Sequence, residues 1–377
     1  MARALSNIAS PDSLTWISNS TDVPGILKAL EQLHHEARRD NGDGPGAVTE
    51  AAAINLIVYS RDRDQLTEAA ALTAELSRRH PSRSILFQPV EDAADSLAAE
   101  VTAVAVVIPG TARQVCCEEI AVIGNGSFSE QMHSIVQPLL IPDIPTFVWW
   151  RGEPPFESET YRRMRRLAAR MIVDSVGFRQ AFGELATEIR LCQEMRCVLS
   201  DLAWRRLETW RDLIAQFFDP PDMRPYLDQI ESVHVHTDGH GYPTEAVLLL
   251  SWLGSRLGWS IHEPIRGSQV SWRGSFTDGS RVIDCLVLHV PAVSPATALT
   301  DLGEIRINAG SAHFWLSSSP GGASVIFRID VGGRAIAESS IGLNAPSLLQ
   351  LLSSELESLH GDRVYEEAVL LGAGAAR

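Results

Sequence analysis

The segment from His234 to His240 reads His-Val-His-Thr-Asp-Gly-His and contains residue types that often bind transition metals. On a β-strand, His234 and His236 point to the same side, as two imidazoles that share a metal ion must. In metal-dependent hydrolases with the pattern His-x-His-x-Asp-His, the last histidine directly follows the aspartate, whereas Gly239 intervenes here. We therefore expect no metal, and a metal-dependent hydrolase at His234, His236 and His240 stays a minor alternative.

The sequence Gly124-Asn125-Gly126-Ser127 is the best candidate for a phosphate-binding turn. It follows an apolar run, so a phosphate would lie at the N-terminus of the next helix. The turn lacks the third glycine and the acidic residue of a dinucleotide-binding fingerprint. We interpret it as an ordinary turn.

Other kinds of catalytic chemistry lack a required side chain. Lys28 is the only lysine and lies in a predicted amphipathic helix, so neither a phosphate-loop NTPase nor a protein kinase is supported. No serine lies in a nucleophile elbow with a histidine and an acid. The sequence predicts a protein that is not an enzyme, with no catalytic residue, no cofactor and no metal.

The segment Thr146–Trp150 predicts a short strand that ends in two adjacent tryptophans. Arg151, Gly152 and two prolines then stop the strand. Because successive strand side chains point to opposite faces, we expect either Trp149 or Trp150 to lie in the core and the other to face away. An aromatic side chain beside an arginine is typical of contact surfaces.

The helix expected after this strand carries four arginines: Arg162, Arg163, Arg165 and Arg166. A solvated face is the ordinary interpretation of such a run. In an acidic chain, however, this cluster also suits an acidic partner or a sugar phosphate, because guanidinium groups pair with carboxylates and phosphates. We expect a partner interface built from these arginines together with Trp149, Trp150 and Arg151.

Length and composition set the broad class. The 377 residues, 45% apolar and 21% charged, suffice for two globular domains. The net charge of −15 disfavours nucleic acid and anionic membranes as partners. No apolar run suits a signal peptide or a membrane span, so we expect a cytoplasmic protein. The five cysteines are expected to be buried thiols rather than a disulfide framework.

The first half of the chain alternates short apolar runs with helical patterns. Strands are expected at 54–59, 85–89, 103–108, 120–123, 146–150 and 171–174, and helices at 21–39, 64–79, 129–140 and 159–169. This alternation is typical of a largely parallel sheet covered on both faces. We predict an N-terminal helix and linker over 1–46 and an α/β, Rossmann-like domain over 47–178.

The second half has a different pattern. Residues 178–218 read as helical, and a helix over 244–257 is ended by Gly258. Period-two runs then follow from 269 to 339, separated by turn sequences such as Asp278-Gly279 and Pro320-Gly321-Gly322. A closing helix is expected over 344–359. We predict a helical connector over 179–222 and an α+β domain with an antiparallel sheet over 223–377.

Five segments together resemble the glucose-6-phosphate dehydrogenase assembly protein family, known as OpcA. They keep the order of the family along the chain. The segments are Asn55–Tyr59, His80–Arg83, Ile141–Pro155, Asp201–Leu213 and Trp252–Trp259.

The resemblance implies a non-catalytic assembly factor and allosteric activator of glucose-6-phosphate dehydrogenase, in the oxidative pentose phosphate pathway. The implied partner is the dehydrogenase itself. Cyanobacterial members of the family are associated with thioredoxin-type redox control, whereas this chain has no cysteine after Cys285. The main alternative is a sugar-phosphate or nucleotide-sugar binding enzyme that uses the α/β domain.

Overall fold

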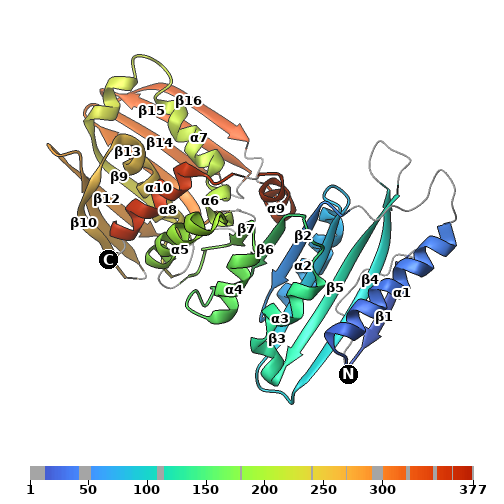
Figure 1. Ribbon diagram of the computed structural model, residues 1–377. Coiled ribbons are helices and arrows are strands. Elements are labelled where there is room, and N and C mark those ends of the chain that lie inside the picture. Colours follow the sequence, from blue (N-terminus) through green and yellow to red (C-terminus); the bar gives the residue numbers. More distant parts are fainter. Residues whose placement is uncertain are drawn as a thin grey trace. The chain divides into compact units, whose positions relative to one another are not determined.

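The structure of the protein is a computed structural model (Figure 1). It describes residues 13–41, 52–107, 114–178, 181–238, 241–268, 270–290, 300–319, 323–342, 346–358 and 360–375. The chain forms two compact units. The first contains Met1–Asp174, Cys192–Ser200 and Leu352–His360, and the second contains Ser175–Leu191, Asp201–Leu351 and Gly361–Arg377. The predicted domain boundaries after residues 46, 178 and 222 stay predictions.

Sheet A forms the core of the first unit and has eight strands in the order β1-β4-β5-β3-β2-β6-β7-β8. Strands β5, β3, β2, β6 and β7 pair in parallel, whereas β1 with β4 and β4 with β5 pair antiparallel. The predicted Rossmann-like α/β arrangement is confirmed. The strands are β1 (Ser13–Ser18), β2 (Ile54–Tyr59), β3 (Ser82–Val90), β4 (Ser96–Val107), β5 (Gln114–Asn125), β6 (Thr146–Trp150), β7 (Arg170–Val173) and β8 (Val198–Asp201).

Helices cover both faces of sheet A, and two adjacent glutamates of β5 show this directly. Glu118 forms ion pairs with His34 of α1 and with Arg83 of β3. Glu119 points to the other face, where it accepts a 2.9 Å hydrogen bond from Thr73 of α2. The helices of this unit are α1 (Val23–Asn41), α2 (Arg63–Leu76), α3 (Met132–Val136) and α4 (Glu159–Leu167), with short 3-10 turns η1 (Gly126–Glu130) and η2 (Gln137–Leu139).

Burial on both faces corrects one expectation about β6. The sequence predicts that one of its two tryptophans faces away from the core, but Trp149 and Trp150 are only 2% and 1% exposed. Every residue of β2 and of β6 is buried. In a sheet covered on both sides, alternation separates two buried faces rather than a buried face from a solvated one.

The strands β4 and β5 are longer than the sequence indicates. Apolar runs predict strands at 103–108 and 120–123, whereas each observed strand has 12 residues. Their extra length includes Glu100, Thr102, Glu118 and Glu119, which are all buried. Polar residues of this kind break an apolar pattern, and only their partners in the fold make them compatible with a buried strand.

The expected helix over 178–218 is interrupted. Helix α5 (Ala181–Met195) ends where Arg196 adopts a left-handed conformation with φ of 57°. The Cys197 amide then donates a 3.0 Å hydrogen bond to the Cys192 carbonyl, which is the 6→1 bond of a Schellman helix end. Strand β8 follows, and then the two short helices α6 (Leu202–Arg206) and α7 (Glu208–Phe217).

A buried arginine joins a late segment of the chain to sheet A. Arg170 of β7 forms a 2.8 Å ion pair with Glu355, and the two side chains are 3% and 2% exposed. Its second terminal nitrogen donates to the carbonyls of Ser358 and His360 at 2.7 and 2.9 Å. These contacts explain why Leu352–His360 belongs to the first unit.

Sheet B of the second unit also has eight strands, in the order β10-β11-β12-β9-β13-β14-β15-β16. Only β12 and β9 pair in parallel, so the predicted antiparallel α+β arrangement is confirmed. The strands are β9 (Ile230–Thr237), β10 (Ser260–Gly267), β11 (Ser271–Thr277), β12 (Val282–His289), β13 (Leu302–Ala309), β14 (Ala312–Ser318), β15 (Ser324–Val331) and β16 (Arg334–Gly342).

Helix α8 (Thr244–Leu257) has the predicted bounds and ends at Gly258, whose φ of 69° favours glycine. The other elements are η3 (Arg224–Gln229), α9 (Leu348–Glu357) and α10 (Arg363–Ala375). The sequence predicts neither β10 nor α10. Among the described helices, none has the length and apolar character that a membrane crossing requires.

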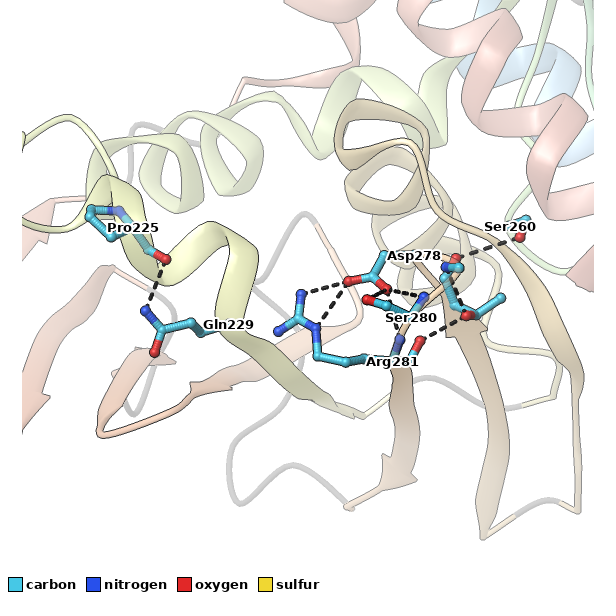
Figure 2. Close-up of polar contacts among 8 residues, drawn as sticks. Pro225, Gln229, Ser260, Asp278, Ser280 and Arg281 are labelled. Carbon is cyan, nitrogen blue, oxygen red and sulfur yellow. Dashed lines mark hydrogen bonds and ion pairs between the residues drawn. The ribbon is translucent and has the colours of Figure 1, made fainter.

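The predicted turn at Asp278-Gly279 joins β11 to β12, and Figure 2 shows its polar contacts. The Asp278 carboxylate accepts 2.8 Å hydrogen bonds from the backbone amides of Ser280 and Arg281, and its other oxygen accepts from the Arg281 guanidinium at 2.6 Å. These donors hold the pKa of Asp278 well below its usual range. The turn sequence Pro320-Gly321-Gly322 lies outside the described residues.

Glu119 should make stability depend on pH. Burial raises its pKa from 4.5 to about 7, the Thr73 hydrogen bond opposes the rise, and the nearby Glu100 adds to it. The folded state therefore holds a proton that the unfolded chain releases above its ordinary pKa. This stabilisation is complete below pH 4.5 and is lost as the pH rises through 7.

We expect Glu119→Gln to be at least as stable as the natural chain at pH 8, because the buried carboxylate no longer ionises. The rise in the pKa of Glu119 corresponds to a loss of at most about 3 kcal/mol in the free energy of unfolding between pH 4.5 and 8. Urea unfolding from pH 5 to 8 measures the difference. The control is Glu91→Gln, which removes an exposed carboxyl. Its free energy of unfolding should depend on pH as that of the natural chain does. If the stability of Glu119→Gln also followed the pH dependence of the natural chain, the raised pKa of Glu119 would be contradicted.

Candidate partner-binding site

The end of β6 lies in a cluster of stacked aromatic rings. The Trp150 indole stacks on Tyr59 of β2 with centroids 3.8 Å apart. Tyr161 of α4 meets the same indole edge-on at 5.1 Å, and Phe156 meets Tyr161 at 5.2 Å. The cluster fixes α4 against the sheet. Two of the seven residues expected at a partner interface, Trp149 and Trp150, therefore support the surface from within the chain.

Arg151 continues from β6 and is held by three kinds of contact. Its backbone amide donates to the Tyr59 carbonyl at 2.9 Å. Its guanidinium lies 4.9 Å from the centre of the Trp149 ring, pairs with Glu68 of α2 at 2.7 Å and donates to the Gln65 carbonyl. Only 13% of the side chain is exposed. A long side chain held in this way is rigid, so contact with a partner would cost it little conformational entropy.

Helix α4 separates its four arginines into a buried one and three that reach solvent. The Ser158 hydroxyl caps the helix by accepting from the Tyr161 amide at 3.2 Å. Arg165 is 4% exposed and lies on the buried side of the helix. The other three define the α4 arginine face: Arg162 is half-buried, and Arg163 and Arg166 are exposed.

Acidic neighbours neutralise part of the α4 arginine face. Arg162 pairs with Glu157 at 2.5 Å, and Arg163 pairs with Glu159 at 2.7 Å. The hydrogen bond from Arg163 lowers the pKa of Glu159. Arg163 also contacts His133, whose pKa is lowered by burial and by this guanidinium. Exposed pairs of this kind are weak, so the arginines can exchange them for the carboxylates of a partner.

The first turn of α2 occupies the position where Rossmann-type proteins bind a pyrophosphate. Here Asp62 caps the helix, and its carboxylate accepts from the backbone amides of Asp64 and Gln65 at 2.8 and 3.1 Å. The segment between β2 and α2 contains no glycine. Because a carboxylate already holds the amides that would bind phosphate, and Asp64 adds a second negative charge, this end of sheet A is unsuited to a dinucleotide.

The turn at Gly126 is closed by another aspartate. Asp95 accepts 2.8 Å hydrogen bonds from the Ser127 amide and from the Ser127 hydroxyl. The backbone hydrogen bond is the larger of the two effects that lower the pKa of Asp95. The carboxylate takes the donors that a phosphate would need, which agrees with an ordinary turn rather than a phosphate site. No local pattern around Ser127 indicates this partner, because Asp95 lies 32 residues away in the chain.

The histidines of β9 are placed on one face of sheet B, as their spacing predicts. His236 lies 3.2 Å from a carboxylate oxygen of Glu304. Burial lowers the pKa of His234, and Arg306 lowers it further. His240 lies outside the described residues. Within the described part of the chain, no group of three or more His, Cys, Asp or Glu side chains is arranged to hold a metal ion.

The tryptophans of α6 and α7 are both core residues. Trp204 and Trp210 are each 2% exposed. The Arg211 guanidinium lies 3.4 Å from the centre of the Trp204 ring and donates to the Trp204 carbonyl. Burial lowers the pKa of Arg211 to about 10. This arginine supports packing and is not part of the α4 arginine face.

Two family models match the chain. Residues 73–189 match the glucose-6-phosphate dehydrogenase subunit N-terminal domain, and residues 197–369 match the corresponding C-terminal domain. A protein named OxPP cycle protein OpcA from Synechococcus elongatus is 26% identical over 329 residues, covering 83% of this chain and 72% of that protein. The protein of the same name from Nostoc punctiforme is 24% identical over 388 residues, covering 98% and 77%.

Solved structures resemble the chain only distantly. The oxidoreductase yvaA from Bacillus subtilis has a TM-score of 0.47 at 9% identity, covering 85% of this chain and 94% of that chain. The WlbA dehydrogenase from Thermus thermophilus, in complex with NAD and α-ketoglutarate, has a TM-score of 0.46 at 10% identity, covering 86% and 94%. Similarity at this level says nothing about activity, so it adds nothing on the site.

Elemental analysis tests the histidines of β9. We expect no stoichiometric zinc or iron in the purified protein, because the inserted Gly239 misplaces the third histidine. A bound metal ion that disappears in His236→Ala would contradict this expectation. His313→Ala is a suitable comparison, because His313 of β14 already bonds to Asn308 at 2.7 Å.

Proposed function

Because the chain belongs to the OpcA family of glucose-6-phosphate dehydrogenase assembly proteins, we propose that it is a non-catalytic assembly factor and allosteric activator of glucose-6-phosphate dehydrogenase. The observation that carries this proposal is the match of both family models over 73–189 and 197–369. The proposal places the protein in the oxidative pentose phosphate pathway and in the cytoplasm, together with the dehydrogenase.

The electrostatics of the first unit favour a non-catalytic role. Asp62 caps the helix where a dinucleotide would bind, and Asp95 closes the only turn that resembles a phosphate cradle in the described chain. Both positions present a carboxylate where an enzyme of this architecture needs free amides. Neither of these two turns offers the anion site that the alternative, a sugar-phosphate or nucleotide-sugar enzyme, would require.

Activation by binding has a simple energetic requirement. An activator must bind the active conformation of the dehydrogenase more tightly than the inactive one, and the difference sets the largest shift that it can cause. We assign the contact to the end of β6 and to α4. Arg151 and the α4 arginine face offer rigid and exchangeable guanidinium groups, while Trp149, Trp150 and Arg165 hold the surface in place.

The purified chain alone should show no dehydrogenase, lactonase or kinase activity. The assay uses glucose 6-phosphate with NADP, 6-phosphogluconolactone, and ATP with a sugar acceptor. Added to the glucose-6-phosphate dehydrogenase of the same organism, the chain should instead raise its activity and co-elute with it. Turnover by the chain alone that survives further purification would overturn the non-catalytic role.

Reversing the charge of the α4 arginine face should weaken the complex. In the variant Arg162→Glu, Arg163→Glu and Arg166→Glu, we expect association with the dehydrogenase to slow by tenfold or more, because charge mainly governs association rate and partner choice. Raising the salt concentration should weaken the natural complex in the same direction. Arg165 is left unchanged, since reversing a buried charge would unfold the helix.

A matched control separates this effect from a change of net charge. The variant Arg63→Glu, Arg78→Glu and Arg79→Glu replaces three exposed arginines on and just after α2, and it changes the net charge by the same amount. It should bind as the natural chain does, and circular dichroism should show both variants folded. Equal binding by the two triple variants would remove the interface assignment while leaving the dehydrogenase as the proposed partner.

A further inference from the structure

Sheet B has a face that the proposed dehydrogenase contact does not use. Along β9 and β13, residues alternate between two faces. Val235 and Ile305 point to the core and are at most 1% exposed. On that side Phe217 of α7 stacks on Phe327 of β15 with centroids 4.3 Å apart. The alternate residues point the other way and keep contact with solvent, and they form what we call the open face.

Regular pairing arranges the open face in rows across the strands. The middle row runs from β11 to β15 and is flanked by one row on each side. The middle row contains Arg273, Leu286, His234, Arg306, Trp315 and Arg328. One flanking row contains Asp284, Ser232, Asn308, His313 and Asp330, and the other contains Leu288, His236, Glu304, Ser317 and Ile326.

The open face carries apolar and aromatic groups that a purely solvated surface does not need. Val282 and Ile326 are 47% and 42% exposed. Arg306 stacks on the Trp315 ring at 4.5 Å, and Leu286 lies two strands away in the same row. Aromatic and arginine anchors among apolar neighbours are characteristic of the centres of protein interfaces.

Charge balance on this face identifies the kind of partner. The three arginines of the middle row stand against Asp284, Glu304 and Asp330 in the flanking rows, so these six groups sum to zero. On the two edge strands the same row continues with Arg266 of β10 and Glu338 of β16, which leave the sum at zero. Arg306 pairs with Glu304 at 2.6 Å, and Arg328 pairs with Asp330 at 2.9 Å. A strongly charged partner would be met by a face of one sign. Two copies of a chain with a net charge of −15 repel each other, and a neutral face is where they can approach.

The size of the face fits a stable contact. Eight strands about 4.8 Å apart and roughly seven residues long make a surface of about 38 by 23 Å. That is close to the 800 Å² or so that each partner contributes to an interface of standard size. An isologous contact, in which the same patch serves both copies, uses one such face twice.

We infer that the open face of sheet B binds the same face of a second copy of this chain, in a two-fold symmetric dimer. The dimer depends on the rows of positive and negative side chains on the open face, which can pair with the same rows of a second copy. It does not depend on the dehydrogenase, so it goes beyond the proposed function.

Sedimentation equilibrium of the full chain from about 1 to 200 μM tests the dimer. The natural chain should approach twice its 41.2 kDa mass. The variant Val282→Lys and Ile326→Lys places four like charges in the contact and should raise the dissociation constant at least tenfold. Both residues are already exposed in the single chain, at 47% and 42%, so the fold should be unaffected.

The matched control is Ile17→Lys with Leu370→Lys, which alters exposed apolar residues of β1 and α10, two elements that contribute nothing to the rows of the open face. It should dimerise as the natural chain does. A natural chain that stays at 41.2 kDa up to 200 μM would overturn the inference. Equal weakening by both variants would do so too. A third result would also overturn it: the natural chain is a monomer, and the open-face variant no longer binds the dehydrogenase. The open face would then be part of the contact with the dehydrogenase.

Discussion

The buried ion pair between Arg170 and Glu355 is the constraint on which the arrangement of the chain depends. Removing two charges from water costs several kcal/mol for each ion, and a pair regains this only when every hydrogen-bonding group has a partner. Both terminal nitrogens of Arg170 find such partners, in Glu355, Ser200 and two backbone carbonyls. The buried charge of Arg170 on β7 is therefore balanced only when a segment 185 residues later in the chain returns to that strand. The first unit cannot be cut out as one continuous stretch of sequence.

The need of hydrogen-bonding groups for partners also explains why a fold typical of enzymes shows no anion site in its described part. Buried or turn-forming carboxylates already hold the donors that a cofactor would use, as Asp62 does at α2 and Asp95 does at η1. Each carboxylate stabilises its own turn by satisfying amides that would otherwise lack partners. The contact that we propose with the dehydrogenase lies on the outer surface instead. There, side chains are held in place by packing from within, as Trp150 and Tyr161 hold α4.

Arginine serves different purposes in different parts of this acidic chain. Arg170 and Arg165 are buried, Arg151 and Arg211 lie against tryptophan rings, and the α4 arginine face reaches solvent. A planar guanidinium can stack and bond in its own plane at once, which an ammonium group cannot do. This accounts for positive charge that comes almost wholly from arginine. It also means that an arginine cluster in the sequence does not reveal which members face outward.

The sequence by itself determined the fold class, the exact bounds of β2, β6 and α8, and the Asp278 turn, because local patterns and local turn chemistry encode them. It also indicated the family, through five segments that resemble the family and keep its order. Tertiary structure alone decided the length of β4 and β5, the burial of both Trp149 and Trp150, and the separation of Arg165 from its neighbours. These features depend on partners far along the chain, such as Thr73 for Glu119. Periodicity reports which side of an element a residue occupies. Only the packed fold decides whether that side meets water or another layer.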